Sequence, residues 1–117
     1  MTRDYSLFIK DILQAINDTE AFTGDMDYAA FQTDEKTRSA VVWKITNIGE
    51  AAKNVPKTIR MRYRSIPWQE MAKMRDKIAH QYFGIDYELV WGVIKKELPA
   101  IKREIEKIVQ QTGHGKA

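Results

Sequence analysis

The sequence predicts an all-α fold, a bundle of four to five main helices joined by short connections. Apolar residues recur every three or four positions over most of the chain, as on one face of an α-helix, and no stretch shows the alternation typical of a strand. The chain has 117 residues, of which 44% are hydrophobic, enough for one domain with its own core. We therefore expect a single helical domain over residues 1–111 and a flexible tail over residues 112–117.

The first half of the chain contains two long helical patterns. One covers about residues 4–22 and ends before a glycine, the residue type usual just beyond a helix. A short helical turn is expected at residues 27–31. The second long helix begins at Thr33 or Asp34, either of which can cap its first N–H groups, and ends before Pro56. The apolar positions on the core faces of these two long helices are Phe8, Ile9, Ile12, Leu13, Ile16, Val41, Ile45, Ile48, Ala52 and Val55.

Small residues in the second long helix predict a close contact with a neighbouring helix. Gly49, Ala51 and Ala52 keep the helix slim at this level, so another helix can approach its backbone. Glu50 lies in the middle of this segment, and two interpretations stay open: a buried, partnered acid or a surface carboxylate.

The second half of the chain predicts three more helices. A short basic helix is expected at residues 58–63, and a central helix follows at residues 68–83. Gly84 ends the central helix, and Asp86 caps the last one, which we expect to be kinked or divided at Pro99 because proline lacks an N–H and crowds the preceding turn. The apolar positions of the last helix are Leu89, Val90, Val93, Ile94, Leu98, Ile101, Ile105 and Ile108.

Several kinds of site are excluded by what the sequence lacks. It has no cysteine, hence no disulfide, thiolate zinc site or cysteine nucleophile. It has two histidines, one of them His114 in the tail, so neither a metal nor a cofactor is expected. It contains no GxxxxGK[ST] or GxGxxG phosphate loop. No apolar run approaches the roughly 20 residues of a membrane span, and no signal peptide is evident, so we expect a cytoplasmic protein.

The charge is unevenly distributed, although the net charge is only +3. Residues 1–35 contain eight acidic and two basic side chains, whereas residues 57–77 contain seven basic and two acidic ones. This asymmetry favours an anionic partner near the central helix. The alternative, that mixed charge only keeps a small helical domain in solution, stays open at this point.

Four polar groups able to do chemistry lie near the end of the central helix. They are Arg75, Asp76, His80 and Tyr82. Asp76 and His80 are four residues apart, so a helix places them on one face within hydrogen-bond reach. Arg75 and Tyr82 are seven apart and also share a face, roughly 10 Å apart along the axis. This cluster has two interpretations: charged residues at a solvated helix end without a special role, or a catalytic site.

The motif Arg75-x4-His80-x-Tyr82, followed by Phe-Gly-Ile-Asp, resembles the Arg-x4-His-x-Tyr motif of the HepT family. These are toxin-type HEPN ribonucleases, usually encoded beside a minimal nucleotidyltransferase antitoxin of the MntA type. The similarity extends over about residues 4–109 and includes Glu35-Lys36-Thr37, Ile48-Gly49-Glu50-Ala51-Ala52, Ile66-Pro67-Trp68 and Glu97-Leu98-Pro99.

This resemblance implies a HEPN-type bundle and a homodimer whose two motifs line a shared basic cleft. It also implies a metal-independent endoribonuclease toxin in a type VII-like toxin–antitoxin system. The nucleotidyltransferase partner would silence the toxin by transferring AMP onto the motif tyrosine, which is Tyr82 here.

The residue types suit this chemistry, because RNA supplies its own nucleophile, the 2′-OH. His80 has a reference pKa of roughly 6.5, which suits proton transfer, and the Arg75 guanidinium binds phosphate oxygens in pairs. Asp76 would orient the imidazole, and Tyr82 would hydrogen-bond the substrate or act as a regulatory hydroxyl. We also expect weaker RNA contacts from the basic residues nearby, namely Lys73, Lys77, Arg60 and Arg64.

Two other functions remain possible from the sequence. One is a non-catalytic helical module that binds a nucleotidyltransferase or a nucleotide, and the other is a plain structural dimer. The presence of all four motif residues favours catalysis over both.

Overall fold

The computed structural model of the protein describes residues 4–79 and 84–113, and within these ranges it contains helices and no strands. The all-α fold class predicted from the sequence is therefore confirmed. None of the helices in these two ranges is both long enough and apolar enough to cross a membrane. The elements are α1 (Tyr5–Thr23), α2 (Tyr28–Thr33), α3 (Glu35–Asn54), α4 (Lys57–Arg62), α5 (Trp68–Ala79), α6 (Tyr87–Gly92), the π-helical turn η1 (Val93–Glu97) and α7 (Leu98–Gly113).

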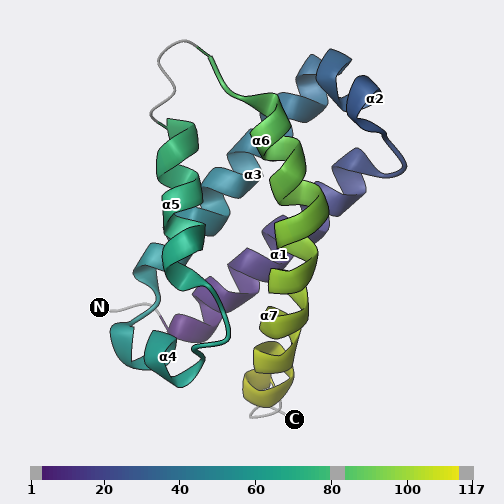
Figure 1. The fold of residues 1–117 in the computed structure, drawn as a ribbon. Coiled ribbons are helices and arrows are strands. Elements are labelled where there is room, and N and C mark those ends of the chain that lie inside the picture. Colours follow the sequence, from purple (N-terminus) through teal and green to yellow (C-terminus); the bar gives the residue numbers. More distant parts are fainter. Residues whose placement is uncertain (1–3, 80–83, 114–117) are drawn as a thin grey trace.

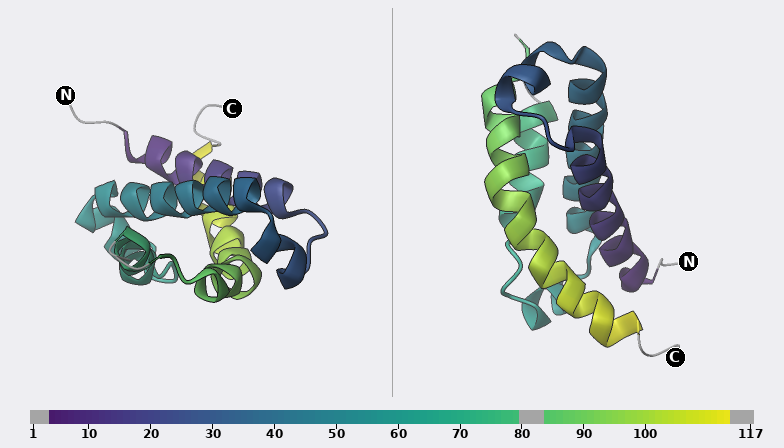
Figure 2. Two further views of the ribbon diagram at one scale, coloured as in Figure 1. Left: turned by 90° about the horizontal axis from the view of Figure 1, so that it is seen from above. Right: turned by 90° about the vertical axis from the view of Figure 1, so that its right-hand side faces the viewer.

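The helices form a two-layered bundle (Figures 1 and 2). Helices α1 and α3 lie side by side in one layer, and α5 lies beside the α6–η1–α7 segment in the other. Helix α3 packs against both α1 and α5, and α7 crosses α1. Helix α3 is thus the element that joins the N-terminal helix to α5, the helix that carries the first two motif residues.

Aspartate side chains begin four of the helices, as their residue type predicts. Asp34 caps α3 by accepting a hydrogen bond from the Thr37 N–H at 3.0 Å, which decides between the two caps that the sequence left open. Asp86 caps α6 by accepting from two backbone N–H groups, as expected. Asp4 and Asp27 play the same part for α1 and α2.

The buried core follows the predicted apolar faces closely. The predicted positions of α3 are buried, as are most of those of α1 and of the α6–η1–α7 segment. Trp68 anchors the start of α5 at 7% exposure, and its indole N–H donates to the Tyr63 carbonyl. Leu89 was wrongly assigned to the core, because it is 36% exposed. It precedes the fully buried Val90 by one residue, which turns it roughly 100° around the helix and away from the core. Phe8 and Leu13 are only partly buried.

The interruption predicted at Pro99 takes the form of a π-helical turn, and helix continues from residue 87 to residue 113. At the end of η1 the Leu98 N–H donates to the Val93 carbonyl, five residues back instead of four. Pro99 cannot donate such a bond, and in an α-helix its ring would crowd the carbonyl of Lys95. The wider turn accommodates the proline without breaking the helix.

Helices α3 and α5 approach each other closely at Gly49. This glycine is buried, and a Cβ atom added to it would lie 2.9 Å from the Met71 carbonyl oxygen and would overlap the Cβ of Arg75. The close helix contact predicted from the small residues of α3 is confirmed, and the neighbour is the motif helix itself. The missing side chain of Gly49 therefore sets the position of Arg75.

We expect Gly49→Ala to destabilise the fold, because the added methyl group meets a backbone carbonyl of α5 that cannot rotate away. Overpacking of this kind costs about 1–3 kcal/mol, more than alanine gains in helix propensity. Gly92→Ala is the matched control, since a Cβ there meets nothing within 4 Å. Thermal unfolding of both variants checks the prediction, and a Gly49→Ala protein as stable as Gly92→Ala would contradict it.

Candidate functional site

The structure describes two of the four motif residues. Arg75 and Asp76 lie on the last turns of α5, whereas His80 and Tyr82 lie outside the described residues. The expected hydrogen bond between Asp76 and His80, and the expected shared face of Arg75 and Tyr82, therefore stay predictions. The described part of the site consists of Arg75, Asp76 and the side chains of α3 that face them.

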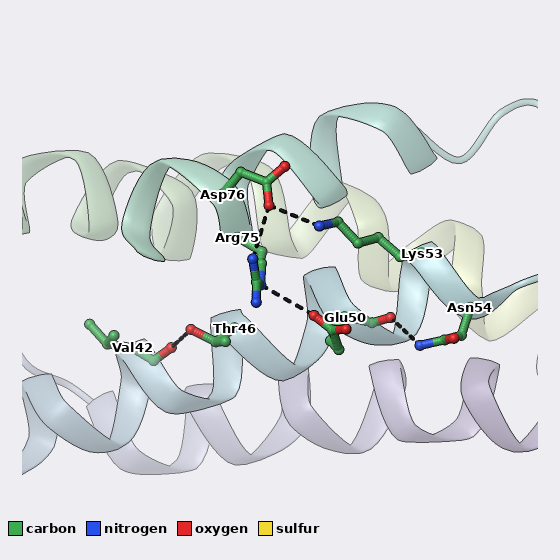
Figure 3. A network of polar contacts seen from close by, with 7 residues as sticks. All are labelled: Val42, Thr46, Glu50, Lys53, Asn54, Arg75 and Asp76. Carbon is green, nitrogen blue, oxygen red and sulfur yellow. Dashed lines mark hydrogen bonds and ion pairs between the residues drawn. The ribbon is translucent and has the colours of Figure 1, made fainter. Parts of the chain in front are cut away.

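Arg75 is held between two carboxylates (Figure 3). Its Nε lies 3.2 Å from Oε1 of Glu50, and its Nη1 donates a hydrogen bond of 3.2 Å to Oδ1 of Asp76. The Nε atom is buried and makes no hydrogen bond to any described residue, so its contact with Glu50 is an ion pair by distance alone. The side chain as a whole is 29% exposed. Ion pairs of this partly exposed kind contribute about 0–1 kcal/mol, so an incoming phosphate can replace them.

Asp76 also contacts the other helix. Its Oδ1 accepts a hydrogen bond from the Lys53 Nζ at 2.9 Å (Figure 3). This bond and the weaker one from Arg75 lower the pKa of the Asp76 carboxyl below its usual range. Asp76 is therefore a carboxylate at neutral pH, and this is the form that can orient an imidazole and favour its protonated state.

Glu50 and Lys53 belong to the site. The sequence left the burial of Glu50 undecided, and Lys53 was not identified from it. The Glu50 side chain is 54% exposed, so it is the surface carboxylate of the two interpretations, yet it is partnered by Arg75. Lys53 comes four residues after Gly49, on the face of α3 where α5 approaches. That spacing is the sequence signal that could have identified it.

The four basic residues expected to contact RNA do not form one surface. Arg60 and Arg64 line a groove of about 550 Å³ between the end of α3, α4 and the start of α5. Lys73 and Lys77 line a smaller cavity of about 90 Å³ between α5 and the α6–η1 segment. The reason is helical geometry, since residues 73 and 77 are one turn apart on a side of α5 turned away from α4.

Within residues 4–79 and 84–113, no group of three or more His, Cys, Asp and Glu side chains is placed to hold a metal ion.

Comparison with known proteins gives a consistent result. Residues 12–108 match the family model described as "Ribonuclease HepT-like". A protein of Methanocaldococcus jannaschii named "Putative RNase" is 48% identical over 108 residues, which cover 92% of this chain and 93% of the relative. A "Probable ribonuclease HepT" of Thermococcus cleftensis is 40% identical over 92% of this chain and 98% of its own. A protein of Caldanaerobacter subterraneus, also named "Putative RNase", is 35% identical over 89% of this chain and 93% of its own. No solved structure matches the chain.

Lys53→Met should raise the pKa of Asp76 toward its ordinary value of about 3.9, because the hydrogen bond that contributes most to the lowering is lost. Since the pKa of Asp76 is lowered in the folded state, its ionised form stabilises the fold above the unfolded pKa, and that stabilisation is lost as pH falls through the folded pKa. The difference in melting temperature between wild type and Lys53→Met should therefore be present at pH 7 and shrink below about pH 4.

NMR titration of the Asp76 carboxyl carbon measures the pKa directly. Lys73→Met is the matched control, because Lys73 is on the same helix as Asp76 but forms no ion pair with any described residue. An Asp76 that titrates identically in wild type and Lys53→Met would contradict the account of the site.

Proposed function

Because this chain belongs to the ribonuclease HepT-like family, we propose that it is a metal-independent endoribonuclease whose site contains Arg75, Asp76, His80 and Tyr82. The structural observation that carries the proposal is the state of Arg75. Its side chain is fixed at the α3–α5 contact and partly exposed, and among the described residues its charge is neutralised by two carboxylates that a phosphate can displace. A planar guanidinium placed in this way suits a phosphodiester better than a lysine would.

The proposed reaction uses the 2′-OH of RNA as nucleophile. The 2′-oxygen forms a bond to the neighbouring phosphorus while His80 takes the 2′-OH proton, and the bond from phosphorus to the 5′-oxygen breaks. A general acid protonates the departing 5′-oxygen, which leaves a 2′,3′-cyclic phosphate and a 5′-OH. Arg75 stabilises the charge that develops on the phosphate oxygens, and Asp76 orients the imidazole.

We further propose that the acid comes from a second copy of the chain. One site has one histidine, whereas the reaction gains from both a base and an acid, so two motifs facing each other in a homodimer would supply both. The surface of α3 supports this arrangement, because Trp43 is 63% exposed and lies on the same helix face as Glu50, seven residues away. In a homodimer formed through this face of α3, the second copy would cover that indole.

His80→Ala should abolish RNA cleavage while leaving the fold intact, because His80 is the group of the motif with a near-neutral pKa. Loss of acid–base catalysis lowers rates by about 10²–10⁴. Gel assays with purified protein measure the rate, and His114→Ala, a change at the chain's other histidine, is the matched control. Undiminished cleavage by a folded His80→Ala protein would rule out this role.

The cellular role that we propose is that of a toxin held in check by a nucleotidyltransferase antitoxin. The antitoxin would transfer AMP from ATP to Tyr82: the phenol oxygen bonds to the α-phosphorus, pyrophosphate leaves, and the phenol proton is released. Tyr82 is two residues from His80 and seven from Arg75. A phosphate attached there would bring negative charge and a bulky adenosine to the position that RNA must occupy, and Arg75 would pair with it instead.

Incubation with the partner and Mg-ATP should add an AMP-sized increment to the intact mass of the wild-type protein. The increment should be absent in Tyr82→Phe and retained in Tyr87→Phe, the matched control with a tyrosine of α6 replaced. Full inhibition without any change in mass would contradict modification and would favour occlusion of the site by the antitoxin.

A further inference from the structure

A groove beside the motif helix has four cations and, among the described residues, no carboxylate in its wall. We call it the basic groove. Its volume is about 550 Å³, and its lining residues are Ala52, Lys53, Lys57, Arg60, Met61, Arg64, Ile66, Trp68, Gln69 and Ala72. Each of three other cavities in the described part of the chain has at least two carboxylates in its wall. The excess of positive charge in its wall therefore makes the basic groove attractive to an anionic ligand.

Three of the four cations of the basic groove, Lys57, Arg60 and Arg64, are not neutralised by any described carboxylate, whereas the fourth, Lys53, pairs with Asp76. Arg60 donates through Nε to the Val55 carbonyl at 3.1 Å, and Arg64 donates through Nε to the Met61 carbonyl at 3.2 Å. Within the described residues, neither arginine forms an ion pair, and nor does Lys57. The backbone carbonyls therefore fix the side chains near Nε, while the terminal guanidinium nitrogens keep their capacity for an incoming anion.

The basic groove is connected to the candidate active site through Lys53. This residue lines the groove, and its Nζ lies 2.9 Å from the carboxylate of Asp76, which in turn accepts a hydrogen bond from Arg75. A polyanion lying along α4 would therefore reach Lys53, which is separated from Arg75 only by the Asp76 carboxylate that both residues contact. This continuity distinguishes the groove from a basic patch elsewhere on the molecule.

We propose that the basic groove binds the phosphodiester backbone of single-stranded RNA next to the bond that is cleaved. The proposal deepens the function proposed above and rests on it. Cations from α3, α4 and the following loop match several successive phosphates better than one small anion. The volume is within the range of roughly 300–1,000 Å³ of small-ligand pockets, so it fits a few nucleotides of one strand and not the face of a duplex. Met61, 50% exposed beside the arginines, offers an apolar contact to a base.

Binding of a fluorescein-labelled RNA of about 12 nucleotides, 2′-O-methylated throughout so that it cannot be cleaved, tests the proposal by anisotropy between 50 and 200 mM salt. The variant is Lys57→Gln/Arg60→Gln/Arg64→Gln. For single strands, each lost phosphate contact lowers the slope of log K against log salt by about 0.7, so the slope should fall by about 2. Wild type should then lose roughly 15- to 20-fold more affinity than the variant over this range of salt.

The matched control is Lys10→Gln/Lys36→Gln/Lys96→Gln, which removes the same charge from exposed lysines outside the groove. Its slope should stay at the wild-type value. If Arg60→Gln unfolds α4, the double variant Lys57→Gln/Arg64→Gln keeps the bond to the Val55 carbonyl and should lower the slope by about 1.4. Circular dichroism confirms that each variant is folded.

Equal weakening by the groove variant and the control would overturn the proposal, since affinity would then follow net charge alone. An unchanged slope in the groove variant would overturn it too, and loss of polyglutamate binding in the same variant would assign the groove to an acidic protein. Wild type that binds through the groove but never cleaves unmodified RNA would contradict the proposed function and leave the groove standing. Unchanged kcat and KM for RNA cleavage by the groove variant would contradict the role of the groove and leave the proposed function standing.

Discussion

The contact between α3 and α5 at Gly49 is the constraint on which the rest of the site depends. A methyl group at this position would overlap the Cβ of Arg75 and press on the backbone of α5, so the two helices reach their observed separation only because the side chain is absent. At that separation α3 brings Glu50 into contact with Arg75 and Lys53 into contact with Asp76. One backbone contact thus decides which carboxylate and which ammonium group the first half of the motif meets.

The charged groups at this contact form an alternating chain. Glu50 contacts Arg75, Arg75 contacts Asp76, and Asp76 contacts Lys53, with every side chain partly open to solvent. Such pairs hold the side chains in position but add little to stability. These ion pairs can therefore be replaced by contacts with a bound phosphate. The last residue of the series, Lys53, also lines the basic groove formed with α4. These contacts therefore orient the four charged side chains and contribute little to the stability of the fold.

Much of this fold could be predicted from the sequence because helix periodicity and capping are local properties. The apolar spacing of α1, α3 and α7, the aspartate caps and the run of small residues around Gly49 are all recognised from residues near one another in the chain. The partners across the α3–α5 contact could not be predicted, because they depend on how one helix is rotated against another. The same rotation separates Lys73 and Lys77 from Arg60 and Arg64, four residues that charge counting had grouped together. His80 and Tyr82 lie outside the described residues, so their roles derive from the motif.

Analysis of RNA products made in the presence of a chelator is the most direct test of the central claim, that this site cleaves RNA through the 2′-OH without a metal. The account predicts that cleavage persists with chelator, that the products end in a 2′,3′-cyclic phosphate and a 5′-OH, and that a single 2′-deoxy substitution at the cleaved nucleotide prevents it. Cleavage that stops with the chelator, or that continues at a 2′-deoxy nucleotide, would contradict the account.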